Sequence, residues 1–288
     1  MKKIFSFLSL FAFSIVFIYS CNSGGSGPAY TIKMRLNPGD TFVQNMQMNM
    51  EMNSFGYKMK MKTNLGWLFQ VLKNDSVTKN LKLTYTKMDM AIDMGKLNKM
   101  QNTQDSLMKK NSEQIVGKSI ILTLSGDNEI TNVSGFEEIM NSQVRDSVGK
   151  EMMKKMFSKD EFNNMFGMMF NMYPKKPVQV GESWNGDVKM NMANLVIKVH
   201  NKYTLLSVKN NLAEINIDGT IGGNGEMMKE SSGLKMDMSG TQKGTMTIRM
   251  DNGYLHSGAY KMDMKTSMEM MGKKIEMTKK GDYNMKGI

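Results

Sequence analysis

Apolar and polar residues alternate along residues 44–72, and this alternation is the clearest pattern in the chain. The first part carries a methionine at every second position, namely Met46, Met48, Met50 and Met52. The second part carries apolar residues at odd positions from Phe55 to Val71. Successive side chains of a strand point to opposite faces, so each part has one apolar and one polar face. The period of two therefore predicts a hairpin, with its turn at Ser54-Phe55-Gly56.

The same alternation predicts strands over most of the remaining chain. Residues 30–36 have the pattern of a first strand, and Asn252-Gly253 is a strong hairpin turn between two late strands. The apolar positions change phase between Tyr85 and Met88, which predicts a β-bulge near Thr86-Lys87. Long strands of this kind twist, so the sheet is expected to be strongly curved.

The spacing of apolar residues becomes helical between Phe136 and Tyr173. Ser158-Lys159-Asp160-Glu161 matches a capping box, so a helix should begin there and end before Pro174. That helix would be apolar over most of its circumference and therefore buried on more than one side.

Two short segments resemble each other at an offset of 142 residues, residues 37–42 and 179–184. Each contains glycine, an acid, a hydroxyl residue and an aromatic residue, and each leads into alternating methionines. This recurrence predicts an internal duplication, although glycine and acidic residues are also common in unrelated turns. The predicted fold class is α+β and mostly β. A strongly curved antiparallel meander sheet from two related halves, 30–134 and 178–288, wraps a central helical insert, 135–177.

The first 20 residues have the layout of a signal peptide, with Lys2 and Lys3 before an apolar run. The run ends at Ser20-Cys21, which resembles a bacterial lipobox, and Cys21 is the only cysteine in the chain. We therefore expect residues 1–20 to be removed, Cys21 to be lipidated, and residues 21–29 to form a flexible tether. The mature protein would be an outer-membrane lipoprotein that faces the periplasm, with residues 30–288 as a single β-rich domain.

The segments around Gly39 and Gly181 also make the chain similar to a known group of proteins. With the lipobox, the methionine-rich strands and the stretch from Pro174 to Trp184, the sequence resembles a family of uncharacterised lipoproteins from Bacteroidota. The resemblance covers residues 30–288 and implies no activity and no catalytic residues. At the level of the fold alone, the predicted layout is also similar to lipoproteins that carry lipids within a curved sheet.

Nothing in the sequence indicates catalysis or a cofactor. His200 and His256 are the only histidines, and neither is placed next to a recognisable nucleophile. No cysteine pair, zinc motif, phosphate loop or calcium loop is present in the sequence. We therefore expect a protein that is not an enzyme and that has no cofactor and no metal bound through histidine, cysteine or carboxylates.

The 36 methionines allow three interpretations. They can fill a core, line an adaptable pocket for a lipid or another apolar molecule, or bind copper(I) through their thioethers. Core packing alone is the most conservative interpretation. The lipid pocket would lie between the sheet and the predicted helix, and its expected lining contains residues from both: Met59, Met61, Trp67, Phe162, Met165, Phe166, Met169, Phe170, Met262 and Met264.

The chain is basic, with a formal net charge of +11, or +9 once Lys2 and Lys3 are removed with the signal peptide. Lysines on the polar faces of strands protect sheet edges and keep a protein soluble, and they can also attract anionic lipid headgroups. Nucleic acid is an improbable partner for an anchored, exported protein without a stacking motif.

The function expected from the sequence is thus an anchored lipoprotein that holds a hydrophobic ligand. The alternatives are an envelope interaction protein with a filled core and, at lower weight, copper(I) binding.

Overall fold

The computed structural model describes residues 27–54, 56–75, 77–93, 95, 115–126, 128–135, 159–192, 195–227, 234–270 and 273–288. The predicted signal peptide and Cys21 lie outside these residues. Eleven strands and one helix make up the described structure: β1 (Thr41–Ser54), β2 (Tyr57–Asn74), β3 (Thr78–Asp93), β4 (Ser119–Ser125), β5 (Ile130–Ser134), α4 (Lys159–Asn171), β6 (Ser183–Met192), β7 (Leu195–Lys209), β8 (Leu212–Met227), β9 (Leu234–Arg249), β10 (Leu255–Met270) and β11 (Lys273–Gly287).

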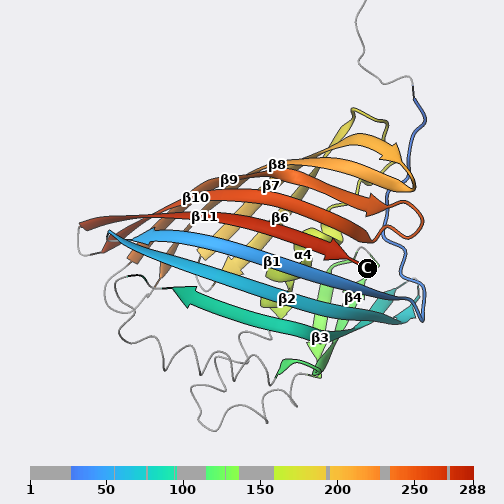
Figure 1. Ribbon diagram of the computed structural model, residues 1–288, viewed down its shortest axis with the longest axis horizontal. Coiled ribbons are helices and arrows are strands. Elements are labelled where there is room, and N and C mark those ends of the chain that lie inside the picture. Colours follow the sequence, from blue (N-terminus) through green and yellow to red (C-terminus); the bar gives the residue numbers. More distant parts are fainter. Residues whose placement is uncertain are drawn as a thin grey trace, which may run out of the picture.

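All eleven strands belong to one antiparallel sheet, in the order β5-β4-β3-β2-β1-β11-β10-β9-β8-β7-β6 (Figure 1). The predicted antiparallel sheet is therefore confirmed. Consecutive strands pair with each other, except β5 and β6, and the last strand, β11, also pairs with β1. The sheet stays open because its two edge strands, β5 and β6, are not paired with each other.

The predicted fold class is wrong, because the described part of the chain is nearly all-β and contains no central helical insert. In the described part of the chain, helical structure is limited to the thirteen residues of α4 and to single residues at Gly95 and Ile115. The helical pattern before Ser158 lies outside the described residues. Long alternating segments form strands of up to 18 residues, so most of the chain is sheet.

The expected first strand at residues 30–36 is also wrong. This segment is extended, but it forms only one isolated bridge, between Tyr30 and Val178. Its apolar residues Ile32 and Leu36 are nevertheless buried.

Helix α4 lies between the two edges of the sheet. It contacts both β5 and β6, so the sheet curls far enough for its edges to approach the same helix. Asn163 Nδ2 donates a hydrogen bond to the Ile130 carbonyl at 3.2 Å, which satisfies an acceptor on the edge of β5. Trp184 Nε1 donates to the Met172 carbonyl at 2.8 Å and joins the end of α4 to β6. The open sheet is thereby bridged by side chains rather than by strand pairing.

The two similar segments form the same turn. Gly39 and Gly181 have φ angles of 92° and 91°, a region that glycine adopts without the clash a Cβ would cause. Gly39 N donates to Val71 O and Gly181 N donates to Leu205 O, both at 2.8 Å. The acid that follows each glycine accepts a bond from a backbone N–H three residues earlier, that of residue 37 or 179. This correspondence supports an internal duplication, which stays a prediction about the origin of the chain.

The two faces of the sheet differ sharply. The apolar residues of each alternating strand point to the inner face, where α4 lies, and lysines such as Lys58, Lys60 and Lys62 are exposed on the outer face.

The expected β-bulge near Thr86-Lys87 is confirmed, because Gly66 pairs with Lys87 while Trp67 pairs with Tyr85 and Thr86 is skipped. The bulge keeps Tyr85 and Met88 on the same face although they are an odd number of residues apart.

Candidate functional site: the inner face of the sheet

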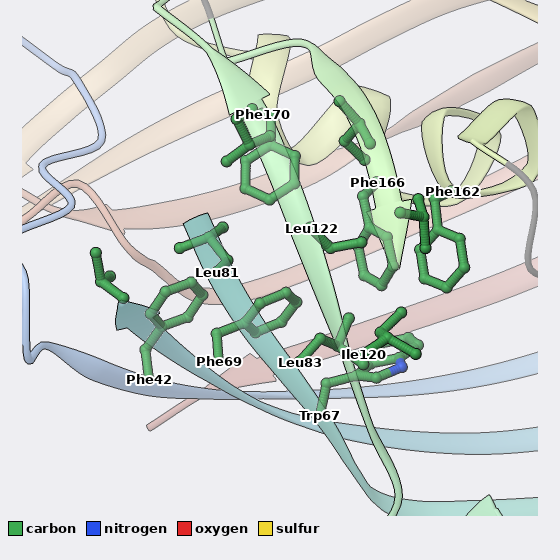
Figure 2. Close-up of a cluster of buried hydrophobic side chains, with 14 of the residues drawn as sticks. Phe42, Trp67, Phe69, Leu81, Leu83, Ile120, Leu122, Phe162, Phe166 and Phe170 are labelled. Atoms are coloured by element: carbon green, nitrogen blue, oxygen red, sulfur yellow. The ribbon is translucent and has the colours of Figure 1, made fainter. Parts of the chain in front are cut away.

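One half of the inner face is a filled aromatic core. Phe162, Phe166 and Phe170 of α4 are each at most 2% exposed and point toward β2 (Figure 2). The ring of Phe166 meets Trp67 edge-on at a centroid distance of 5.3 Å and Phe69 at 5.7 Å. Leucine and isoleucine side chains from β3 and β4 fill the space between these rings. This part of the molecule is solid packing.

A small cavity remains between α4 and the strands β7 to β11. Its volume is about 90 Å³. Six of the lining residues are methionines, contributed by α4, by the residue that follows it, and by β1, β9 and β11: Met46, Met168, Met169, Met172, Met246 and Met285. Ligand pockets usually have volumes of about 300–1,000 Å³. The enclosed space between helix and sheet is therefore too small to hold a whole lipid.

Two buried amides face each other at this cavity. Gln242 Nε2 donates to Asn201 Oδ1 at 2.5 Å, and Asn201 Nδ2 donates to the Tyr203 hydroxyl at 3.1 Å. Both amides also donate to the sulfur of Met168 on α4, at 3.7 and 3.8 Å. Gly219 leaves the room that this pair occupies, because a Cβ there would lie 2.1 Å from Asn201 Oδ1. The amides thus satisfy each other and hold the helix to the sheet.

Three tyrosines lie on the same inner face: Tyr203 on β7, and Tyr260 and Tyr283 on the neighbouring strands β10 and β11. Tyr260 and Tyr283 stack with centroids 4.6 Å apart. Burial raises the pKa of Tyr203 to about 12, although the hydrogen bond from Asn201 acts in the opposite direction. Burial likewise raises the pKa of Tyr283 to about 12 and raises that of Tyr260 further. These phenols are neutral at physiological pH and serve as hydrogen-bonding groups.

The other half of the inner face is apolar but only partly covered. We call it the methionine face: the inner-face methionines closest to the turns that join β1 to β2 and β10 to β11. They are Met50, Met52, Met59, Met61, Met236, Met238, Met262, Met264, Met268 and Met277. Their strands pair in register, with Met50 opposite Met61 and Met52 opposite Met59. All but Met50 and Met264 are partly accessible to solvent.

Lys279 is a charged side chain on the inner side of β11, between Met277 and Gly281. It is paired with Met52 of β1 and with Met264 of β10, so it projects into the methionine face. Burial lowers the pKa of Lys279 below its ordinary value of 10.5. Among the described residues, none forms an ion pair with Lys279, whereas the adjacent Lys280 on the outer face lies 3.8 Å from Asp263.

Larger hollows have more charged side chains in their lining. One, of about 680 Å³, is lined mainly by charged outer-face residues of β1, β2, β3 and β11, and Met50 and Met61 of the methionine face also touch it. Another, of about 270 Å³, lies where α4 meets β5 and β6 and is also lined by charged and amide side chains. No group of three or more histidine, cysteine or carboxylate side chains in the described ranges is placed to hold a metal ion.

The two histidines have no shared site. His200 Nδ1 lies 3.0 Å from Asp187 Oδ1, with both side chains exposed. His256 Nδ1 is buried and has no hydrogen-bond partner among the described residues. The expectation that the chain is not an enzyme stays a prediction.

The structure divides the predicted ligand-lining residues instead of gathering them into one pocket. Trp67, Phe162, Phe166 and Phe170 belong to the filled core, and Met169 packs against it and touches the small cavity. Four others lie on the methionine face: Met59, Met61, Met262 and Met264. The side chain of Met165 lies outside what the structure describes.

Sequence reasoning missed the polar residues of the inner face. Asn201, Gln242 and Lys279 each occupy a position whose strand neighbours two residues away are mostly apolar or glycine. A polar residue in the apolar phase of a strand is the signal that would have found them. The cavity residues Met168, Met172 and Tyr260 were missed for another reason, because they come together only through the packing of α4 on the sheet.

A family model described as "Family of unknown function (DUF6263)" matches residues 76–255, which is more than half of the chain. The chain belongs to the DUF6263 family. The expected membership of a family without an assigned function is thereby confirmed. The bacterial group, the lipobox and the methionine-rich motifs that the resemblance implied stay predictions. The DUF6263 match begins just before β3 and ends at the first residue of β10.

Solved structures give only remote likenesses to this DUF6263 chain. The COG4313 outer membrane channel from Pseudomonas putida F1 is 6% identical, with a TM-score of 0.21 over 88% of this chain and 97% of the channel. OccK11 (OpdR) from Pseudomonas aeruginosa is 4% identical, with a TM-score of 0.19 over 91% of this chain and 99% of that chain. OmpT from Vibrio cholerae is 6% identical, with a TM-score of 0.15 over 88% and 100%. Likenesses of this size carry no inference about function.

No curated protein sequence matches the DUF6263 chain. No helix in the described part of the chain is long and apolar enough to cross a bilayer.

Proposed function

We propose that this chain is a lipoprotein of the bacterial cell envelope that binds a lipid or another hydrophobic molecule on the methionine face of its sheet. The anchor would be Cys21, and the ligand would lie on the inner side of β1, β2, β9, β10 and β11. The protein would bind its ligand without changing it chemically. The proposal rests chiefly on one observation, the ten methionines gathered on a partly covered, curved apolar surface.

The chemistry of methionine suits such a role. Its unbranched thioether side chain has several rotatable bonds and adapts to irregular apolar shapes, so methionine is common on surfaces that accept varied ligands. Contiguous apolar surface that is left exposed in a soluble domain usually marks a binding site. Leu or Ile would fill a core equally well, because volume and polarity matter more there than flexibility.

The geometry favours an open groove over an enclosed pocket. The space under α4 measures about 90 Å³, and the aromatic core beside it is filled. A ligand with a long acyl chain would therefore extend over the partly exposed methionines toward the β1–β2 turn. Met61 and Met59 on β2, together with Met262 on β10, would be its first contacts.

Native mass spectrometry of the chain carrying Cys21→Ser, which lacks the predicted acylation site, tests the proposal. We expect the purified protein to carry a bound lipid or to take up the neutral apolar dye N-phenyl-1-naphthylamine. The double substitution Met59→Gln and Met61→Gln should weaken dye binding by about tenfold, because it places two amides under the ligand.

The matched control is Leu206→Gln on β7, an apolar residue that is 43% exposed on the outer face. It should bind the dye as the parent chain does. A parent chain that carries no lipid and takes up no dye would contradict the proposal. Equal loss in the control and in the double variant would show that dye binding does not depend on the methionine face.

The filled core gives specific support to a second candidate, an envelope protein that acts through protein contacts. In that case the methionine face would receive an apolar segment of a partner protein. Chemical cross-linking in native membranes would then recover one partner, and the Met59→Gln and Met61→Gln pair would abolish its capture. Copper(I) binding stays a prediction; the Met168 sulfur already accepts hydrogen bonds from Asn201 and Gln242.

A further inference from the structure

Lys279 is placed where a strand of this sheet should carry an apolar residue. On β11 the positions two before and two after it are Met277 and Gly281, and its partners across the sheet are Met52 and Met264. All of these positions share the inner face, because neither pairing of β11 shifts register. The ammonium group therefore projects from a surface that is built mainly of thioethers.

An ammonium group in these surroundings has lost part of its hydration. Burial lowers the pKa of Lys279, which means that the folded chain disfavours its charged form. The neighbouring residues offer little in return, since none of the described residues forms an ion pair with it. A partly buried cation without a counter-ion is destabilising unless something else supplies the negative charge. Such groups occur preferentially at functional sites.

We infer that Lys279 binds the carboxylate of a fatty-acid anion whose hydrocarbon chain lies along the methionine face. This inference rests on the proposed function and specifies its ligand. The carboxylate would accept hydrogen bonds from the Lys279 ammonium, and the acyl chain would cover the row of methionines that begins at Met52. The bound anion restores the charge balance that the sheet itself does not provide.

A single lysine matches a small headgroup of one charge. A fatty-acid carboxylate carries one negative charge and needs few other partners. A phospholipid brings a phosphate together with further polar headgroup atoms, each of which needs a hydrogen-bond partner when covered. Near Lys279 the polar groups on the inner face are three hydroxyls: those of Ser54 and Thr266, each diagonal to it across a strand pair, and that of Tyr283, which lies over Gly281. The surroundings therefore favour the carboxylate.

The experiment compares hexadecanoate with hexadecanol, which has the same chain length and no charge. Each displaces N-phenyl-1-naphthylamine from the full-length chain carrying Cys21→Ser at pH near 7.5. We expect hexadecanoate to bind about tenfold more tightly than hexadecanol, the size of a charge-assisted hydrogen bond. Lys279→Met should remove that difference, and Lys279→Arg should keep most of it. Lys280→Met, which changes the adjacent outer-face lysine, should leave both affinities unchanged.

The possible results separate the inference from the function on which it rests. If Lys279→Met binds hexadecanoate as tightly as the parent chain, or if hexadecanol already binds equally well, the carboxylate site is refuted while hydrophobic binding stands. Stronger displacement by phosphatidylglycerol than by hexadecanoate also refutes it, in favour of a phosphate headgroup. If neither the dye nor either ligand binds the parent chain, the proposed function and the inference both fail.

Discussion

Substitution of Phe166 by alanine tests whether α4 is an integral part of the sheet's core. The ring is 2% exposed and meets both Trp67 and Phe69 edge-on. Replacing a buried phenylalanine by alanine typically costs about 3–5 kcal/mol, because burial is lost and a cavity remains. The two edge-on ring contacts place this site toward the upper end of that range. For a domain of this size such a loss lowers the melting temperature by roughly 6–20 °C.

Urea denaturation followed by tryptophan fluorescence measures the change, since Trp67 directly contacts the substituted ring. Val180→Ala is the control, because Val180 is 43% exposed and should alter the free energy of unfolding by less than about 0.5 kcal/mol. A loss below about 1 kcal/mol for Phe166→Ala would refute the reasoning. It would mean that α4 does not dock on β2 in solution and that the aromatic core is incomplete without it.

Three further results are expected. Gly181→Ala should lower the free energy of unfolding by about 1–3 kcal/mol in a thermal melt, because the φ of 91° strains any residue with a Cβ. Gly222→Ala is the control and should lower it far less, because Gly222 lies in open space and has no positive φ. Equal losses in the two variants would contradict the account of the turn. Gln242→Leu should lower the free energy of unfolding in urea by about 1–3 kcal/mol, because Asn201 Oδ1 loses its hydrogen-bond donor. In a double-mutant cycle with Asn201→Leu, the two losses should be coupled rather than additive. The pKa of Tyr203 is raised to about 12 from an ordinary 10.0, so its contribution to stability is complete below pH 10.0 and is lost as the pH rises toward 12. Tyr203→Phe should remove this part of the fall in stability at alkaline pH. Urea denaturation at a series of pH values measures the difference.

Sequence periodicity predicted the local structure better than the long-range arrangement. The change of phase at Thr86-Lys87 led directly to the observed bulge, because a strand shows which face each residue occupies. The same reasoning failed for residues 30–36, whose alternation fits a buried extended segment as well as a paired strand. The fold class failed because helical spacing was extended over the whole of 135–177, whereas the described helix is the segment between the capping box and Pro174.

The candidate site was harder to predict because it depends on which strands are neighbours. Alternation identified Met59 and Met262 as apolar positions, but it cannot show that β11 inserts between β1 and β10. Only that insertion places Lys279 opposite Met52, in addition to the Met264 that the β10–β11 hairpin already places beside it. The separation of the aromatic core from the methionine face was likewise hidden, because it follows from where α4 packs along the sheet.

The position of β11 has a consequence for how the protein is made. β11 comes last in the sequence among the described strands, yet it completes the middle of the sheet by pairing with β1, the first of them. Until it arrives, β1 and β10 each present an unpaired backbone edge beside a row of thioethers, and such edges associate readily with other chains. Contacts between the two ends of a chain also form slowly. Folding therefore cannot be completed strand by strand from β1 onward, because the middle of the sheet closes only when β11 pairs with β1.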